Sequence, residues 1–457
     1  MSNGRLCRQV LISLATLALL VGGARPSARA EERKSRRVAV VDASPEPRLY
    51  TSRNFQVMTD LSEERARELL ERLETMLKLV SAYFGRPNKR QIEMFVFDDF
   101  SNWSDKQLSQ LSRDGVAMVR SGGGLTITEG VTNGSDFVAR SVVYAGSDHG
   151  TPQHEAVHAY CGNAFGGCGP VWYAEGMAEV GNYWRDNDKG VNTDPRIIRY
   201  LKSREPRPLN DIVNKELETT GDSWQNYAWR WALCHLLGFN ENYTKRFKPL
   251  GLALLANQHT DFWEVYGGQA EEIEFEYRQF LKDMEPGYRC DLASWDWKTK
   301  FQQLRGNESA QSVIRADHGW QASRLQVTAG AEYQCVASGT VKLTKVEEAP
   351  PAPKGEKAPQ ATSEVTLLGA VLQDYELGDP FEVPKDGRFT APGDGKLYLR
   401  CADAWGSLGD NTGKLTIRMT RADAKERGQK SDVGGQPETA AGGQRSAVSK
   451  KARLSAD

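Results

Sequence analysis

The chain has 457 residues, and its 59 lysines and arginines nearly balance its 60 aspartates and glutamates, which gives a formal net charge of −1. That balance excludes a globally basic nucleic-acid-binding protein and a strongly acidic, solvent-expanded chain. The hydrophobic content of 39% suffices for globular domains, and the mean hydropathy of −0.57 predicts that some segments stay polar.

The N-terminus has the three parts of a secretory signal peptide. Arg5 and Arg8 precede the apolar run 10–21, which is shorter than the roughly 20 residues that span a bilayer. An Ala-Arg-Ala sequence ending at Ala30 predicts cleavage at that point. We therefore expect residues 1–30 to be removed and the mature protein to be secreted or periplasmic, with no integral membrane segment. An uncut N-terminal anchor is the alternative.

The next part of the chain changes from polar to globular. Residues 31–49 are charged and contain prolines, so we expect a flexible lead-in. From residue 50 the apolar residues recur with strand or helix periods. The predicted elements are strands at 55–59, 92–97 and 125–128, and a helix that Ser62 caps and Gly85 ends.

Residues 151–285 are predicted to be mostly helical, and short β-rich runs divided by Gly, Pro and Asp follow from about residue 312. The predicted helices lie near 152–165, 170–184, 209–218, 224–239 and 271–284. The tail 421–457 has too few large apolar residues to order itself.

The first of these helices carries a His-Glu-x-x-His motif at His154, Glu155 and His158. Thr151 as a cap and Pro152 in the first turn place the motif on a helix. Histidines four residues apart face the same way, so they can hold one Zn²⁺, with Glu155 beside them to take a proton from water. The alternative is a helix with two solvated or core histidines.

A catalytic zinc usually has three protein ligands, so a third is needed. Glu175 follows His158 after 16 residues, and Glu179 lies one helical turn further on the same face. One glutamate could bind the metal while the other orients a ligand histidine. A solvated helix face is the alternative explanation for this pair.

The segments HEAVH and WYAEGMAE resemble the gluzincin metallopeptidases, in particular the secreted bacterial peptidase MA-like group, over about residues 50–285. The resemblance implies an α+β zincin fold. It also implies that His154, His158 and Glu175 bind zinc, that Glu155 is the general base, and that Glu179 is the acidic partner of the first zinc histidine.

Members of that family often place a tyrosine on the helix predicted at 224–239, which here carries Tyr227. A phenol can donate a hydrogen bond to the oxyanion of the transition state. A buried structural tyrosine is the alternative. His235 is the rival candidate, but on an apolar helix we interpret it as a core histidine. The remaining histidines, His149, His259 and His318, belong to no motif.

Six cysteines would remain after signal removal, an even number that favours disulfides in an exported protein. Six cysteines allow 15 pairings. Cys161 and Cys168 bracket the turn between the two motif helices and suit a short disulfide, with extra metal ligands as the alternative. Cys335 and Cys401 lie on strands expected to be adjacent, so they are a second candidate pair.

The β-rich region contains one loop with hard oxygen ligands. We expect two strands within 319–330 and 333–339 joined by a glycine turn, and strands on both sides of a polar loop at 403–411. Asp403, Asp410 and Asn411 in this loop offer the oxygens that Ca²⁺ selects. A plain Asx/Gly hairpin loop is the alternative.

Residues 312–420 resemble the calcium-dependent galactose-binding bacterial lectins, most clearly in this loop. The resemblance implies Ca²⁺ bound by the side chains of Asp403, Asp410 and Asn411 and by the Ser407 carbonyl, with both aspartates facing a sugar. The other sugar contacts of that family fall where this chain has a Pro/Lys-rich insertion.

The sequence thus predicts an α+β zincin-like catalytic domain followed by an all-β sandwich. The function predicted is that of a secreted zinc metallopeptidase that hydrolyses peptide or protein substrates, with a carbohydrate-binding-like module for Ca²⁺ and a glycan. A non-catalytic glycan- or cell-wall-binding protein on a zincin scaffold is the alternative. The expected segments are a signal peptide (1–30), a lead-in (31–49), the zincin-like domain (50–287), a connector (288–311), the sandwich (312–420) with a disordered insertion (346–363), and a disordered tail (421–457).

Overall fold

The computed structural model describes residues 6–13, 46–133, 136–186, 188–213, 223–343 and 365–422. The expected cleavage point at Ala30, the insertion 346–363, and most of the lead-in and of the tail lie outside these residues. In the described part of the chain, every helix is too short or too polar to cross a membrane.

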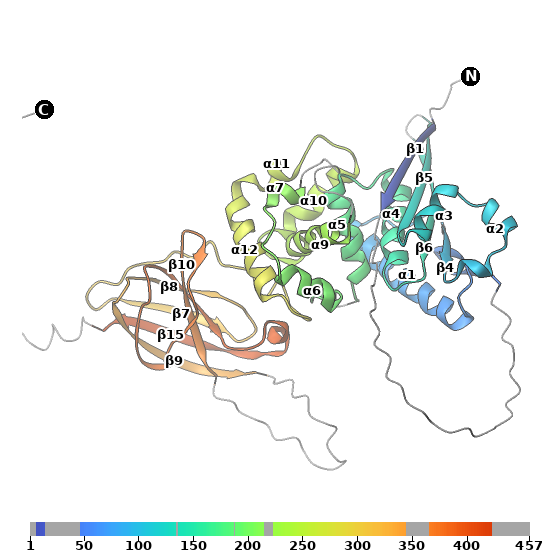
Figure 1. Ribbon diagram of the computed structural model, residues 1–457. Coiled ribbons are helices and arrows are strands. Elements are labelled where there is room, and N and C mark those ends of the chain that lie inside the picture. The colour runs from blue at the N-terminus through green and yellow to red at the C-terminus, as the bar shows by residue number, and fades with distance from the viewer. Residues whose placement is uncertain are drawn as a thin grey trace, which may run out of the picture.

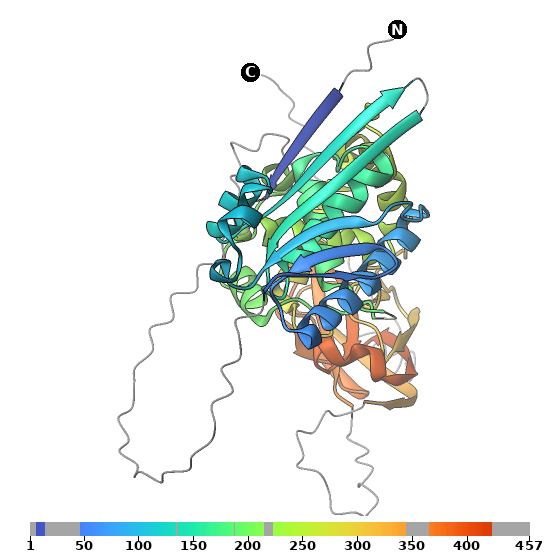
Figure 2. The same cartoon turned by 90° about the vertical axis from the view of Figure 1, so that its right-hand side faces the viewer.

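The N-terminal part is a six-stranded mixed sheet with the order β1-β5-β6-β4-β3-β2. Its strands are β1 (Leu6–Ser13), β2 (Arg48–Thr51), β3 (Phe55–Thr59), β4 (Ile92–Phe97), β5 (Gly124–Asn133) and β6 (Asp136–Gly146). Strands β3, β4 and β6 run parallel, while β1, β5 and β2 pair antiparallel with their neighbours. Figure 2 shows β1, which falls inside the expected signal peptide, at the outer edge of the twisted sheet.

Helix α1 (Glu63–Phe84) connects β3 to β4, as a parallel pair requires. Ser62 caps the helix and Gly85 ends it with φ of +73°, as the sequence predicts. Its buried side recurs every three to four residues, at Ala66, Leu69, Leu73, Met76, Leu77, Val80 and Phe84. This side packs in one core with the sheet and with α4 (Thr151–Phe165).

The middle of the chain is helical, and Figure 1 shows these helices between the sheet and the C-terminal β-sandwich. Beyond α4 the helices are α5 (Val171–Tyr183), α6 (Pro195–Lys202), α7 (Leu209–Val213), α9 (Trp224–Phe239), α10 (Thr244–Leu255), α11 (Phe262–Tyr266) and α12 (Ala270–Asp283). Two short helices, α2 (Asp105–Ser109) and α3 (Arg113–Arg120), precede β5. The sequence predicted α4, α5, α9 and α12 to within two residues, while α6 and α10 were not predicted.

The C-terminal part is a sandwich of two antiparallel sheets, which confirms an all-β region after an α+β region. One sheet contains β8 (Gln321–Val327), β10 (Leu367–Gln373), β11 (Glu376–Leu377), β12 (Phe381–Glu382) and β14 (Gly395–Cys401). The other contains β7 (Ser309–Arg315), β9 (Glu332–Lys342), β13 (Asp386–Thr390) and β15 (Thr412–Arg421). A shared apolar core fills the space between the sheets.

The sequence-based strand pairing was wrong in the sandwich. Strands β8 and β9 follow each other across Gly330 but belong to different sheets, as do β14 and β15 on either side of the polar loop. The loop 403–411 is therefore a crossing between sheets and not a hairpin end. Cys335 on β9 and Cys401 on β14 consequently lie on facing sheets and not on adjacent strands.

The expected disulfides are absent, because the six cysteines that would remain after signal removal are free and buried: Cys161, Cys168, Cys234, Cys290, Cys335 and Cys401. Burial without a disulfide suits the use of cysteine as a small apolar residue. Cys168 instead places its sulfur 3.5 Å from the carbonyl oxygen of His158.

Candidate metal centre

Helix α4 carries its histidines inside the protein core. The helix is buried on every side from Thr151 to Gly162, so it is a core helix without a solvent-exposed stripe. Thr151 is the first helical residue and not the cap that the sequence predicted. The carboxylate of Asp148 accepts hydrogen bonds from the backbone N–H groups of Gly150 and Thr151, both at 2.9 Å. These N–H groups have no partner within the helix.

Three side chains from α4 and α5 meet at one point. His154 Nε2 lies 3.1 Å from His158 Nε2 and 3.1 Å from Glu175 Oε2, and His158 Nε2 lies 3.4 Å from the same oxygen. All three residues are buried. This His-His-Glu cluster (His154, His158 and Glu175) could hold a metal ion, and among the described residues no other group of three His, Cys, Asp or Glu side chains converges in this way.

Glu179 orients the first histidine of the cluster. Its Oε1 lies 2.9 Å from His154 Nδ1, and its second oxygen accepts a weaker hydrogen bond from Asn182 at 3.4 Å. A proton on Nδ1, donated to Glu179, leaves the Nε2 lone pair of His154 directed at the centre of the cluster. The structure therefore places Glu179 where an outer partner of a metal ligand belongs.

The electrostatics of the cluster favour positive charge at its centre. Burial disfavours the charged form of His154, but hydrogen bonds and charges from Glu175 and Glu179 outweigh it and raise the pKa of His154 well above its usual value. Against the same burial, Glu175 raises the pKa of His158 to about 10. The charges and hydrogen bonds of the two histidines likewise overcome burial and lower the pKa of Glu175.

Glu155 lies beside the cluster, and only one of its two carboxylate oxygens accepts a hydrogen bond from the described part of the chain. Its Oε2 accepts a hydrogen bond from Thr126 Oγ1 at 2.7 Å, while its Oε1 is buried and has no hydrogen-bond partner among the described residues. Burial raises the pKa of Glu155 despite the nearby histidines. This is the environment of a carboxylate that can exchange a proton with a small molecule in the site.

Two residues of β5 shape this position and were not predicted from the sequence. Thr126 supplies the hydrogen bond described above. Gly124 allows Glu155 to approach, because a Cβ at Gly124 would lie 2.7 Å from both Cγ and Oε1 of Glu155. The glycine run before β5 is visible in the sequence, but only the packing of β5 on α4 connects it to the motif.

Helix α9 brings Tyr227 next to the cluster. The tyrosine is buried, and its ring centroid lies 5.6 Å from that of His154. His235, further along α9, stacks on Phe280 at 5.8 Å and lies 4.7 Å from Phe239. Burial lowers the pKa of His235 to about 4, so it is a neutral core histidine, as the sequence predicts.

The loop 403–411 satisfies several of its polar groups internally. The Asn411 amide donates to Asp403 Oδ2 at 2.8 Å and to the carbonyl of Ala316 at 3.3 Å. The side chain of Asp410 is exposed. The part of it that is buried, and next the charge of Asp403, raise the pKa of Asp410. Ser407 lies in a 3₁₀ turn, Trp405–Asp410. The structure thus brings Asp403 and Asn411 together through a hydrogen bond between the two side chains.

The same loop packs against the end of the helical region. The N–H of Gly406 donates to Glu285 Oε1 at 2.5 Å, and the Trp405 ring lies 5.7 Å from that of Tyr288. The guanidinium of Arg400 stacks on Trp405 at 3.9 Å. The loop therefore forms part of the junction between the helices and the sandwich.

No protein-family model and no curated protein matches this chain. Among solved structures, the chain is similar to one titled "EclA N-terminal domain; PllA-like lectin", with 18% sequence identity and a TM-score of 0.18. That match covers 24% of this chain and 95% of the other. A TM-score this low supports no statement about the fold or function of this protein.

Proposed function

We propose that the protein is an exported zinc metallopeptidase of the zincin type, in which His154, His158 and Glu175 bind Zn²⁺. The observation that carries the proposal is the convergence of two imidazole nitrogens and one carboxylate oxygen, buried and held on two core helices. Two histidines and one glutamate are also the ligand set of a known class of catalytic zinc sites.

The donor spacing supports zinc. Ligands about 2.0–2.1 Å from a tetrahedral Zn²⁺ lie about 3.3 Å from one another. The three separations in the cluster are 3.1, 3.1 and 3.4 Å. Two Nε2 lone pairs that face each other at 3.1 Å repel unless a cation or a proton lies between them. The residues present therefore fit the ion.

The chemistry follows from what stands around the cluster. When bound, Zn²⁺ supplies a Lewis acid that polarises a peptide carbonyl and favours the loss of a proton from water. Glu155 Oε1, free and buried, takes that proton and later returns it to the leaving amine. Thr126 holds the other oxygen of Glu155 in place, and the phenol of Tyr227 donates to the developing oxyanion.

The sandwich has a separate role in this proposal, as a carbohydrate-binding-like module that uses the loop 403–411 for Ca²⁺ and a glycan. Two carboxylates, an amide and a carbonyl within nine residues support the hard-cation part. Further oxygen ligands would have to come from other strands, since Ca²⁺ takes six to eight.

The test is Glu155→Gln in the full-length protein. We expect this variant to bind zinc as the wild type does and to lose hydrolysis of a peptide library by at least about a hundredfold, because an amide cannot accept the proton. Glu71→Gln, an exposed change on α1, is the matched control and should leave turnover unchanged. A zinc-loaded wild type that cleaves no peptide in the library would instead favour the non-catalytic alternative.

A further inference from the structure

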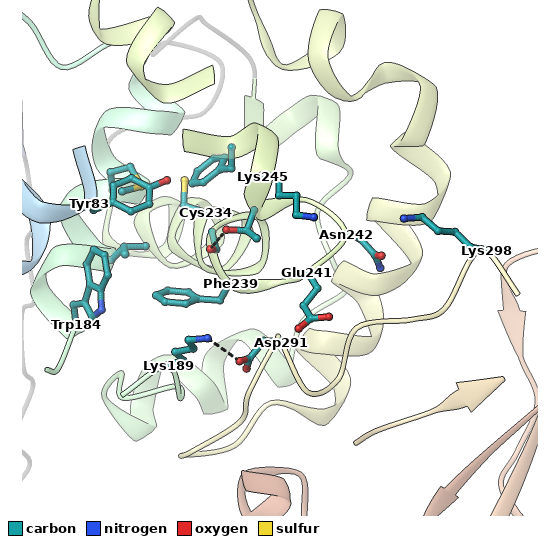
Figure 3. A pocket seen from close by; sticks show the side chains of 15 residues that line it. Tyr83, Trp184, Lys189, Cys234, Phe239, Glu241, Asn242, Lys245, Asp291 and Lys298 are labelled. Atoms are coloured by element: carbon teal, nitrogen blue, oxygen red, sulfur yellow. Dashed lines mark hydrogen bonds and ion pairs between the residues drawn. The ribbon is translucent and has the colours of Figure 1, made fainter. Parts of the chain in front are cut away.

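A cavity of about 640 Å³ lies apart from the His-His-Glu cluster, none of whose residues line it. On α5 it contacts Met177 and Val180, which lie on the side of the helix opposite Glu175 and Glu179. On α9 it reaches Gly238 near the C-terminal end, whereas Tyr227 belongs to the first turn. Figure 3 shows this cavity, which none of the catalytic residues line.

The inner wall of the cavity is aromatic and apolar. The Trp184 ring lies 5.7 Å from Tyr83 and 5.8 Å from Phe239, both with edge-to-face geometry. Met177 and Phe247 are buried beside them. Such a surface suits the apolar body of a small ligand, and the volume is in the range of small-molecule sites.

One polar group in this wall has no partner. The hydroxyl of Tyr83 is buried and makes no hydrogen bond within the described residues. Burial also raises the pKa of Tyr83, so the hydroxyl keeps its proton. A buried donor without an acceptor costs about 1–3 kcal/mol. Because the hydroxyl oxygen has almost no accessible surface, the cavity wall offers a ligand the ring of Tyr83 and not its oxygen.

The rim of the cavity carries an excess of positive charge. Lys189 pairs with Asp291 at 3.2 Å, so this lysine and this aspartate largely compensate each other. Lys245 and Lys298 are exposed and form no ion pair with any described residue. Figure 3 shows Lys245 next to Asn242 and above Glu241, and Lys298 with its ammonium group directed toward Asn242. The charged residues of the lining, three lysines and two carboxylates, thus carry a net charge of +1.

From this arrangement we propose that the cavity binds a small amphipathic carboxylic acid, with an aromatic body against Tyr83, Trp184 and Phe239 and its carboxylate at Lys245 and Lys298. The net charge of the rim favours an anionic head over a cationic one. The aromatic corner favours an aryl group, because edge-to-face contacts add to simple burial. The site is independent of the metal, and its occupation does not require the proposed peptidase activity.

The experiment compares three probes with the same body, 4-phenylbutyrate, 4-phenylbutanol and 4-phenylbutylamine, by calorimetry on the full-length protein. We expect one equivalent of 4-phenylbutyrate per chain, bound at least about fivefold more tightly than the alcohol, with the amine weakest. Equal or tighter binding of the alcohol or the amine would overturn the assignment, as would no binding of the acid at 5 mM.

Two variants locate the bound probe. Lys245→Gln with Lys298→Gln should weaken 4-phenylbutyrate about fivefold or more, and the exposed Lys300→Gln is the control because Lys300 does not line the cavity. Gly238→Leu should fill the cavity, since the atoms nearest to a Cβ there are 3.7 Å away. Circular dichroism and thermal unfolding verify that each variant folds. Undiminished binding in the double lysine variant, or in a folded Gly238→Leu protein, contradicts the proposal.

Discussion

The His-His-Glu cluster and the loop 403–411 both gather side chains that can bind a cation, but they are built differently. The cluster takes its donors from two separate core helices, and its donor atoms lie within 3.4 Å of one another. The loop takes its donors from nine consecutive residues, and two of these, Asp403 and Asn411, use each other as hydrogen-bond partners.

The difference shows what a prearranged site needs. Helices α4 and α5 are fixed by packing in the core, so their side chains remain directed at one point. In the loop, a cation would have to replace the hydrogen bond between Asn411 and Asp403. We therefore expect tight binding in the cluster and weak binding in the loop, and the following experiments test that contrast from the largest effect to the smallest.

Among the variants of this series, Tyr227→Phe should have the largest effect. If the phenol donates only to the transition state, kcat falls by about a hundredfold while KM changes little. Steady-state kinetics on a cleaved peptide measures this. Tyr200→Phe, on α6, is the matched control. Unchanged kcat in Tyr227→Phe would make Tyr227 a packing residue of α9.

His235 tests what burial does to a histidine without a bonded carboxylate. Its folded pKa of about 4 lies below the ordinary value of 6.5, so the unfolded chain binds the proton first. The free energy of unfolding should therefore fall by up to roughly 3 kcal/mol as the pH drops from 6.5 to 4. Urea unfolding across this range measures the slope.

His235→Phe should remove that acid-dependent loss, because phenylalanine cannot take up a proton. The exposed His259→Phe serves as the control and should keep the wild-type slope. An identical slope in His235→Phe would show that other groups cause the acid sensitivity.

Glu179→Gln should weaken zinc binding about 10- to 100-fold, since it removes the charge that orients His154 and increases its basicity. Competition with a zinc chelator gives the dissociation constant. The exposed Glu71→Gln change is again the reference. If both variants matched the wild type, the contact between Glu179 and His154 would have no role in holding the metal.

The loop should give the smallest effect. Calorimetry of the full-length protein with Ca²⁺ should show a dissociation constant of about 0.1–1 mM, typical of weak extracellular sites. Asp403→Ala should abolish the binding, and the exposed Asp379→Ala should not. If calorimetry detects no heat of Ca²⁺ binding, the loop is not a calcium site. A micromolar dissociation constant would show that the loop is prearranged like the cluster.

Local patterns predicted the parts of the protein that depend on neighbours along the chain. The stripe from Ala66 to Phe84 gave α1, and the four-residue spacing of His154 and His158 placed both on one side of α4. The shared face of Glu175 and Glu179 follows in the same way. Each is a consequence of the 3.6-residue helical repeat.

Contacts between distant segments could not be predicted in this way. The hydrogen bond from Thr126 to Glu155 joins a strand to a helix 29 residues later. The separation of Cys335 from Cys401 depends on which sheet receives β9 and β14, and alternation within a strand gives no information on its partners. The sequence therefore named the metal-binding residues but missed the strand that positions the general base.

The measurement that tests the central proposal most directly is the metal content of the purified full-length protein beside that of His158→Ala. Inductively coupled plasma mass spectrometry should find one zinc per chain in the wild type and less than about a tenth of that in the variant, because two remaining ligands hold zinc poorly. His318→Ala, outside the cluster, should keep the full equivalent. A wild-type protein that takes up no zinc, or a His158→Ala protein that retains a full equivalent, would contradict the assignment of the cluster.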